Sequence, residues 1–111
     1  MAVVIRNPRE TRIKESGAHG TSEALLAGPA SGSNRFIIRR ITLNPDGCTA
    51  RVSFDRTVVY FVHKGRVTLS HDAGELDLLS PGDTAVIHPD ELHHLHNIDK
   101  LKAVIIRVAS Q

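Results

Sequence analysis

Apolar residues form short runs separated by turn residues along most of the chain. Glycine, proline and aspartate lie between the runs, for example at Pro81-Gly82-Asp83. Runs of this length that lack a helical period and are rich in β-branched residues predict β-strands joined by turns. The pattern therefore predicts an all-β barrel or sandwich. The expected strands span residues 35–43, 49–54, 57–63, 66–70, 75–79, 84–87, 93–97 and 103–108.

The remaining segments have a weaker pattern. Val3-Val4-Ile5 is a short apolar run that ends before Asn7-Pro8. Residues 15–33 are rich in glycine, alanine and serine, so we expect a loop around one short strand there. Asn-Pro-Asp-Gly at 44–47 predicts a turn, and His71 to Gly74 predicts the loop of a hairpin.

Composition narrows the class of protein. A chain of 111 residues with 41% hydrophobic content is long enough for one domain with a core of its own. The formal net charge is only +2 and no basic stripe is present, so we expect no nucleic-acid partner. Nowhere do eighteen apolar residues occur together, which predicts no membrane span. The apolar run near the N-terminus is too short for a signal peptide and Cys48 is the single cysteine, so we expect a cytoplasmic protein.

Three segments together resemble the cupin family. Gly82–Asn97 (GDTAVIHPDELHHLHN) is similar to the second cupin motif, Tyr60–Leu69 to a strand-turn-strand of the family, and Leu79–Thr84 to the entry of that second motif. The resemblance spans residues 17–108 and implies a double-stranded β-helix, the jelly-roll barrel of small cupins. It implies a single cupin domain over residues 1–111, with an N-terminal arm and edge strand at 1–16 and a barrel core at 17–108.

The resemblance also locates the metal site of the family and shows that this chain departs from it. His93 stands at the one ligand position of the second motif. The three ligand positions of the first motif fall on Val52, Phe54 and Val58, which have no lone pair to donate. His88 also stands where the family favours proline. We therefore expect neither a metal at this position nor another cofactor.

Strand alternation predicts which side chains line the barrel. If His93 points inward, as its position in the family implies, Leu95 and Asn97 share its face and His94 and His96 point away. Arg39 and Arg40 are adjacent, so one of them faces the barrel; we favour Arg40, whose guanidinium suits a carboxylate or phosphate on a ligand. The expected pocket residues, besides His93 and Tyr60, are Arg40, Val52, Phe54, Val58, Val62 and Leu95.

These expectations leave three functions open. In the first, a metal-independent enzyme of the isomerase, cyclase or lyase type acts on a small metabolite, with His93 as general acid or base and Tyr60 donating to an oxyanion. In the second, the pocket only binds a small molecule, as in a sensor or accessory protein. In the third, a metal is held by relocated histidines, for which His88, His94 and His96 are the nearby candidates.

The expected assembly is a homodimer. Small cupins pair through exchanged or added edge strands, and this chain resembles them. The apolar segment Val3-Val4-Ile5 is suited to add to the sheet edge of a second copy.

Overall fold

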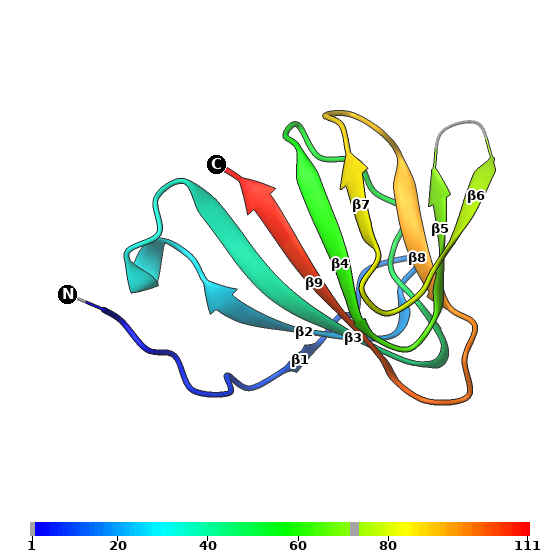
Figure 1. Ribbon diagram of the computed structural model, residues 1–111, viewed down its shortest axis with the longest axis horizontal. Helices are drawn as coiled ribbons and strands as arrows, with labels where there is room; N and C mark the ends of the chain where they lie inside the picture. Colours follow the sequence, from blue (N-terminus) through cyan, green and yellow to red (C-terminus); the bar gives the residue numbers. More distant parts are fainter. Residues whose placement is uncertain (1, 72–73) are drawn as a thin grey trace.

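The computed structural model describes residues 2–71 and 74–111, and over these residues the protein is all-β, as predicted. The 3-10 turn η1 lies between strands β2 and β3 (Figure 1). Among the described residues, no helix combines the length and the apolar character needed to cross a membrane. The elements are β1 (Thr11–Arg12), β2 (His19–Ala27), η1 (Pro29–Ser31), β3 (Phe36–Cys48), β4 (Val58–Lys64), β5 (Val67–His71), β6 (Glu75–Leu79), β7 (Thr84–Ile87), β8 (His93–Asn97) and β9 (Ala103–Ser110).

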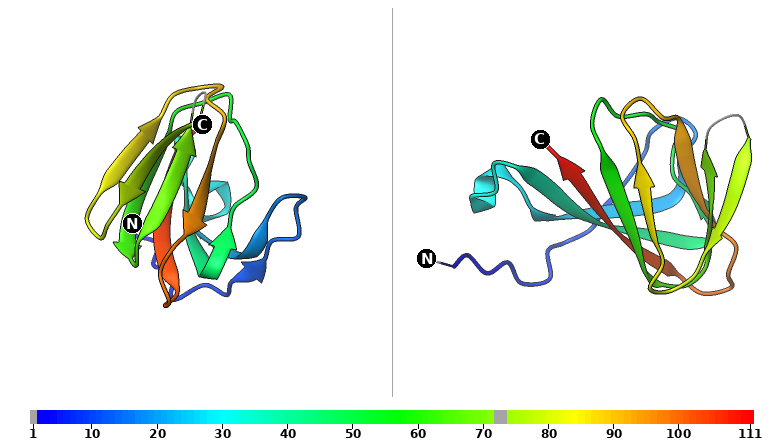
Figure 2. Two further views of the ribbon diagram at one scale, coloured as in Figure 1. Left: turned by 90° about the vertical axis from the view of Figure 1, so that its right-hand side faces the viewer. Right: turned by 45° about the horizontal axis from the view of Figure 1, so that its top comes forward.

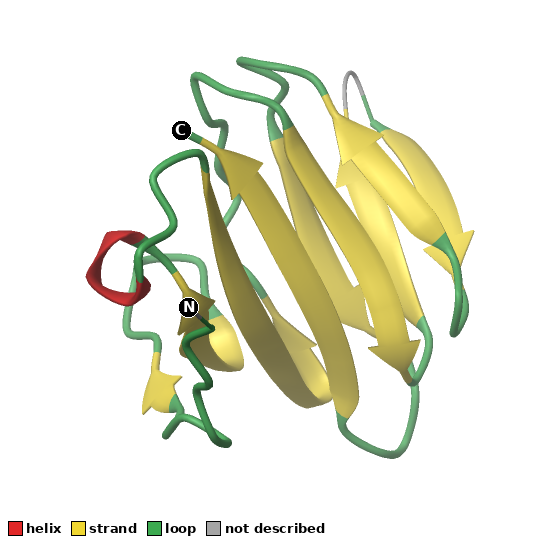
Figure 3. Ribbon diagram, turned by 60° about the vertical axis from the view of Figure 1, so that its left-hand side comes forward, coloured by secondary structure: helices red, strands yellow, loops and turns green. Residues whose placement is uncertain are grey.

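The strands form two antiparallel layers that wrap into a nearly closed barrel. One layer has the order β1-β2-β3-β9-β4-β7 and the other the order β6-β5-β8. The layers join where the end of β3 pairs with β8, at Cys48 and His96. Both strands β2 and β3 continue beyond the barrel toward η1, as Figures 1 and 2 show, and Figure 3 gives the broad layer from outside. This arrangement is the jelly roll that the resemblance implies.

The core fills the space between the layers because alternate residues of each strand are apolar. On β4, Val58, Tyr60 and Val62 point inward and are at most 2% exposed, while Val59 and Phe61 point outward. Leu95 on β8 faces them with no exposed surface. The rest of the buried apolar cluster is Ile41, Leu43, Val67, Leu69, Leu79, Ile87, Ala103 and Ile105.

Three segments differ from the expectation. The one short strand expected within residues 15–33 is longer than expected: β2 has nine residues. Its register against β3 places Thr21 opposite Leu43 on the inner face, where Thr21 is 2% exposed, so tertiary pairing overrides the low β-propensity of the segment. The predicted turn at 44–47 is part of β3. The backbone of β3 is irregular at Asp46, where φ is +62°. The predicted strand at 49–54 is reduced to one bridge between Val52 and His93.

The N-terminal arm, predicted with an edge strand over residues 1–16, forms its strand near the end of that range. Thr11 and Arg12 form β1, whereas Val3, Val4 and Ile5 belong to no strand and are 43–67% exposed. The predicted hairpin of β5 and β6 is present, but His71, which was expected in its loop, ends β5 and pairs with Glu75. Asp72 and Ala73 of the predicted loop lie outside the described residues.

Candidate functional site

A hydrogen bond joins the two residues predicted to be catalytic. Tyr60 lies on β4 and His93 begins β8, and the two side chains meet between the layers, where the residues are 2% and 1% exposed. The Tyr60 hydroxyl oxygen is 2.8 Å from Nε2 of His93, and the ring centroids are 5.4 Å apart in an edge-to-face arrangement. Two buried polar groups thus satisfy each other, which removes most of the cost of burying either.

The second nitrogen of His93 determines the direction of this hydrogen bond. Nδ1 lies 2.8 Å from the backbone carbonyl oxygen of Glu91, which can only accept. Nδ1 therefore carries the ring proton, and Nε2 of the neutral imidazole accepts the proton that the Tyr60 hydroxyl donates. The backbone just before β8 in this way orients the histidine toward the phenol.

Burial keeps both groups uncharged at neutral pH. It lowers the pKa of His93 from its ordinary value of 6.5; the Glu91 carbonyl opposes this shift, and the charge of Arg107 adds to it. Burial also raises the pKa of Tyr60 from its ordinary value of 10.0, and the Arg107 guanidinium opposes that rise by its charge and by a hydrogen bond. The pair is therefore a protonated phenol on a neutral imidazole.

A small cavity of about 120 Å³ borders the Tyr60 side of this pair. Val52, Phe54 and Tyr60 form its less polar wall, and Arg107 and Glu23 supply charge. His93 is outside the lining: it reaches the cavity through Tyr60 and through Phe54, whose ring centroid is 5.8 Å from that of the imidazole. The other lining residues are Ile13, Glu15, Thr21, Thr49 and Ala50.

Arg107 and Glu23 are site residues that the sequence reasoning missed. Arg107 lies on β9 opposite Tyr60 on β4, and its guanidinium sits 5.3 Å from the centroid of the Phe54 ring. One of its nitrogens is 3.3 Å from the Glu23 carboxylate on β2, and the two side chains are only 14% and 18% exposed. Alternation along 103–108 could have placed Arg107 on the same face as Ala103 and Ile105. Glu23 gave no such signal, because the short strand expected within residues 15–33 had no predicted bounds or register.

The predicted pocket residues divide into three groups. Val52 and Phe54 line the cavity as expected. Val58, Val62 and Leu95 face inward but are fully buried in the core, with no exposed surface for a ligand to contact.

Arg40 is the remaining predicted pocket residue, and it lies outside the cavity. Its guanidinium reaches the Pro8 carbonyl oxygen at 3.1 Å and the Glu10 carboxylate at 3.5 Å, on the outer face of the broad layer. The reason is its position in the alternation: Ile41 and Leu43 point inward, so Arg39 shares their face and Arg40 does not. Two larger hollows, of about 570 and 520 Å³, are on this outer side, near the N-terminal arm and around Arg40, and neither is lined by histidine or tyrosine.

The residues around His93 do not fit the metal that the cupin fold implies. Both ring nitrogens of His93 are engaged, by Tyr60 and by Glu91. The neighbours at the other family ligand positions are Val52, which pairs with His93 through two backbone hydrogen bonds, and Phe54. One neutral nitrogen cannot replace the hydration shell of a divalent ion. We therefore derive no chemistry through a metal at this position.

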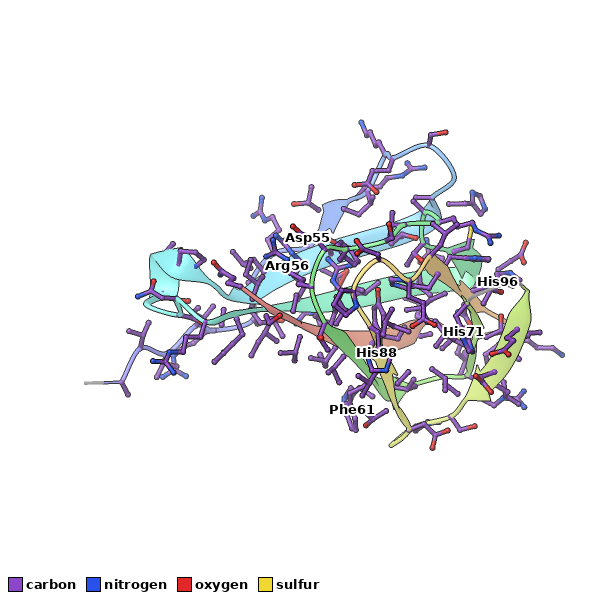
Figure 4. All side chains as sticks on the ribbon, turned by 90° about the horizontal axis from the view of Figure 1, so that it is seen from above. Asp55, Arg56, Phe61, His71, His88 and His96 are labelled. Carbon is purple, nitrogen blue, oxygen red and sulfur yellow. The ribbon has the colours of Figure 1, made fainter. Side chains whose placement is uncertain are left out.

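The other histidines do not assemble into a metal site within residues 2–71 and 74–111. His71 and His88 border one hollow that His96 does not line (all three are labelled in Figure 4). His96 is 2.7 Å from Asp46, and His71 is 2.7 Å from Asp77, so each already faces a carboxylate. His94 shares the outer face with His96, as alternation predicts.

Comparison with known proteins agrees with this geometry. The profile of the AraC-like ligand binding domain family matches residues 41–108. No curated protein matches the chain in sequence.

Similar solved structures cover nearly the whole chain. The polyketide cyclase RemF from Streptomyces resistomycificus is 23% identical with a TM-score of 0.88, over 99% of this chain and 79% of that one. A predicted oxalate decarboxylase from Thermotoga maritima is 18% identical with a TM-score of 0.87, over 97% and 98% of the two chains. A sugar phosphate isomerase of the cupin superfamily from Silicibacter pomeroyi is 24% identical with a TM-score of 0.73, over 83% and 60%. The chain therefore belongs to the AraC-like ligand binding domain family and is a small protein of the cupin family.

Proposed function

We propose that this cupin binds a small metabolite in the Tyr60 cavity and moves a proton on it without a metal, in a reaction of the isomerase, cyclase or lyase type. The observation that carries the proposal is the 2.8 Å hydrogen bond between the Tyr60 hydroxyl and Nε2 of His93. Tyr60 stands at the cavity wall, and His93 stands behind it. Tyr60 is thus the catalytic residue, and His93 acts through it as a positioning and proton-accepting residue.

The geometry supports a balanced proton transfer. Tyr60 takes a proton from a carbon next to a carbonyl group and passes its own hydroxyl proton to Nε2 of His93. The C–H electron pair becomes an enolate, which the guanidinium of Arg107 in the cavity wall stabilises. Return of the proton to another carbon gives an isomer, attack of the enolate on a second carbonyl closes a ring, and departure of a leaving group with its electron pair gives a lyase product.

The similar solved structures support this class of chemistry only because they share the fold of this chain. A polyketide cyclase and a sugar phosphate isomerase are among the proteins that share the barrel. A second candidate function is binding without catalysis, which the AraC-like ligand binding domain family favours. The size of the cavity restricts either function to a small ligand, because about 120 Å³ is well below the roughly 300–1,000 Å³ of ordinary ligand pockets.

The sole tyrosine makes the proposal testable before a substrate is known. The chain has one tyrosine and no tryptophan, so ultraviolet absorbance and intrinsic fluorescence report on Tyr60 alone. A metabolite library is screened by this fluorescence, and hits are followed by NMR for exchange of substrate protons with deuterated water. We expect exchange in the wild type that falls at least a hundredfold in Tyr60→Phe and His93→Gln. Changes in the NMR signals of the ligand, which do not depend on the tyrosine, should show that binding is kept in both variants.

Two further variants separate catalysis from binding alone. Val52→Phe fills the cavity and should abolish both binding and exchange, whereas Arg40→Gln, on the outer face, should change neither. Binding that persists in His93→Gln without any proton exchange in the wild type would support the sensor or accessory function instead. Binding that survives the filled cavity would place the ligand elsewhere and contradict both functions.

We also propose that the protein is a homodimer. Val3 and Val4 of the N-terminal arm are 64% and 67% exposed, and Phe61 and Val86 are 39% and 54% exposed on the outside of the broad layer (Phe61 in Figure 4). Apolar surface of this extent is typical of an association site. Light scattering at tens of micromolar protein should give twice the monomer mass, and Val4→Glu should lower it. Leu76→Glu, equally exposed but on β6, is the control; a monomeric wild type would contradict the proposal.

A cytoplasmic location completes the proposal. The single cysteine, Cys48, is a free thiol whose Sγ is 3.5 Å from the Gly17 carbonyl oxygen. Free thiols persist in reducing compartments. Cys48 therefore supports the cytoplasm as the place where the protein works.

A further inference from the structure

We infer that the metabolite is a small organic anion, with a carboxylate or phosphate group that binds Arg107. The inference rests on the proposed function, since it concerns the same cavity, and it adds the class of ligand. Arg107 is the charged group of the cavity wall that stands directly opposite Tyr60. An anion on its guanidinium would lie beside the hydroxyl that moves the proton.

The guanidinium of Arg107 has donors to spare. It carries five N–H groups, and its ion pair with Glu23 is a single contact at 3.3 Å rather than a two-pronged one. Phe54 covers one face of the group at 5.3 Å and leaves its edge for hydrogen bonds. Because the side chain is only 14% exposed, an anion there would meet little competing water.

A second arginine, which does not line the cavity, stands next to Arg107 in the sheet. Arg39 on β3 is paired in register with Arg107 on β9, and alternation puts both on the inner face. Within the part of the chain that the structure describes, Arg39 makes no ion pair and no side-chain hydrogen bond. Like charges directly opposite each other across a sheet are unfavourable.

The carboxylates of the cavity do not balance these two cations. Glu23 is the partner of Arg107. Glu15 also lines the cavity, but it is exposed, so water screens its charge. An anionic ligand would relieve the repulsion between the two arginines. It would also compete with Glu23 for Arg107.

This competition provides the sharpest variant. Glu23→Gln removes the internal competitor and leaves Arg107 in place, so anion binding should become about fivefold tighter. If the Arg107–Glu23 ion pair only stabilises the fold, Glu23→Gln should not tighten anion binding. Arg107→Gln should weaken binding at least tenfold, and Arg39→Gln should weaken it by a smaller factor. Arg40 follows Arg39 on β3 but lies on the outer face, so Arg40→Gln is the matched control and should behave as the wild type.

The experiment uses acetate, inorganic phosphate and the neutral analogue acetamide as probes, with Tyr60 fluorescence as the readout and thermal melting as a check on the folding of each variant. We expect saturable responses to acetate or phosphate, none to acetamide, and tightening in Glu23→Gln. No response to either anion in both wild type and Glu23→Gln would overturn the inference, as would equal affinity in Arg107→Gln. If neutral library compounds bind and exchange protons while anions do not, the inference fails but the proposed function stands.

Discussion

Replacing Asn97 with alanine should destabilise the protein by about 3 kcal/mol. The side chain is fully buried at the end of β8, and its amide nitrogen lies within 3.1 Å of the carbonyl oxygens of Leu43, Asn44 and Leu101. Its amide oxygen accepts from the backbone N–H of Asp99 at 2.8 Å. Each buried group that loses its partner costs about 1 kcal/mol or more, so the losses add to about 3 kcal/mol.

Urea unfolding measures the effect, with Asn34→Ala as a control on an exposed asparagine. The control should stay within about 0.5 kcal/mol of the wild type, as surface substitutions usually do. The hydrogen bonds of Asn97 indicate that its amide holds β3 to the loop before β9. A loss of stability in Asn97→Ala no larger than that of the control would contradict this role.

The second large effect is a gain of metal binding. Val52→His, Phe54→His and Val58→Glu together restore donors around His93, and the triple variant should bind a divalent ion where the wild type binds none. Val52 is hydrogen-bonded to His93 through the backbone, and the Phe54 ring is 5.8 Å away, so the new side chains arise beside the imidazole. A metal must also displace the Tyr60 hydroxyl from Nε2.

Metal analysis and calorimetry with Mn²⁺, Ni²⁺ and Zn²⁺ provide the measurement. Adding His93→Ala to the triple variant should remove the binding. Stoichiometric metal in the wild-type protein that disappears in His93→Ala would contradict the account of the site. A folded triple variant that binds no ion would show that these three positions do not converge on His93.

Much of the fold could be predicted because it depends on local pattern. Strands such as Glu75–Leu79, Thr84–Ile87 and His93–Asn97 have the predicted bounds, since each is a short apolar run between turn residues. The length and register of strand β2 could not be predicted in this way. Its small residues become a strand through their register with β3, which is a tertiary effect.

The candidate site was predictable only in part, for a similar reason. Tyr60 and His93 were found because the family resemblance placed His93 and alternation placed Tyr60. The arginine was assigned to the wrong face, since adjacent Arg39 and Arg40 can be told apart only when the inward residues of β3 are known. Glu23 enters the site through the register of β2 against β3, which the sequence did not predict, and Arg107 joins the site through the pairing of β9 with β4.

The buried pair also makes stability depend on pH. The pKa of His93 is lowered from 6.5 in the folded protein, so as the pH falls below 6.5 the unfolded chain takes up the proton first. The contribution of His93 is therefore complete above pH 6.5 and is lost as the pH falls toward the folded pKa. In the same way, the raised pKa of Tyr60 gives a contribution that is complete below pH 10.0 and is lost as the pH rises above it.

The hydrogen bond from a protonated Tyr60 to a neutral His93 is the central claim, and NMR tests it most directly. Proton–nitrogen correlation spectra of isotope-labelled protein, recorded across pH, report both the tautomer and the pKa of each histidine, and His93→Gln assigns the His93 signal. We predict a neutral His93 with its proton on Nδ1 and a pKa below 6.5. A proton on Nε2 at neutral pH, or a pKa of His93 at or above 6.5, would contradict the account.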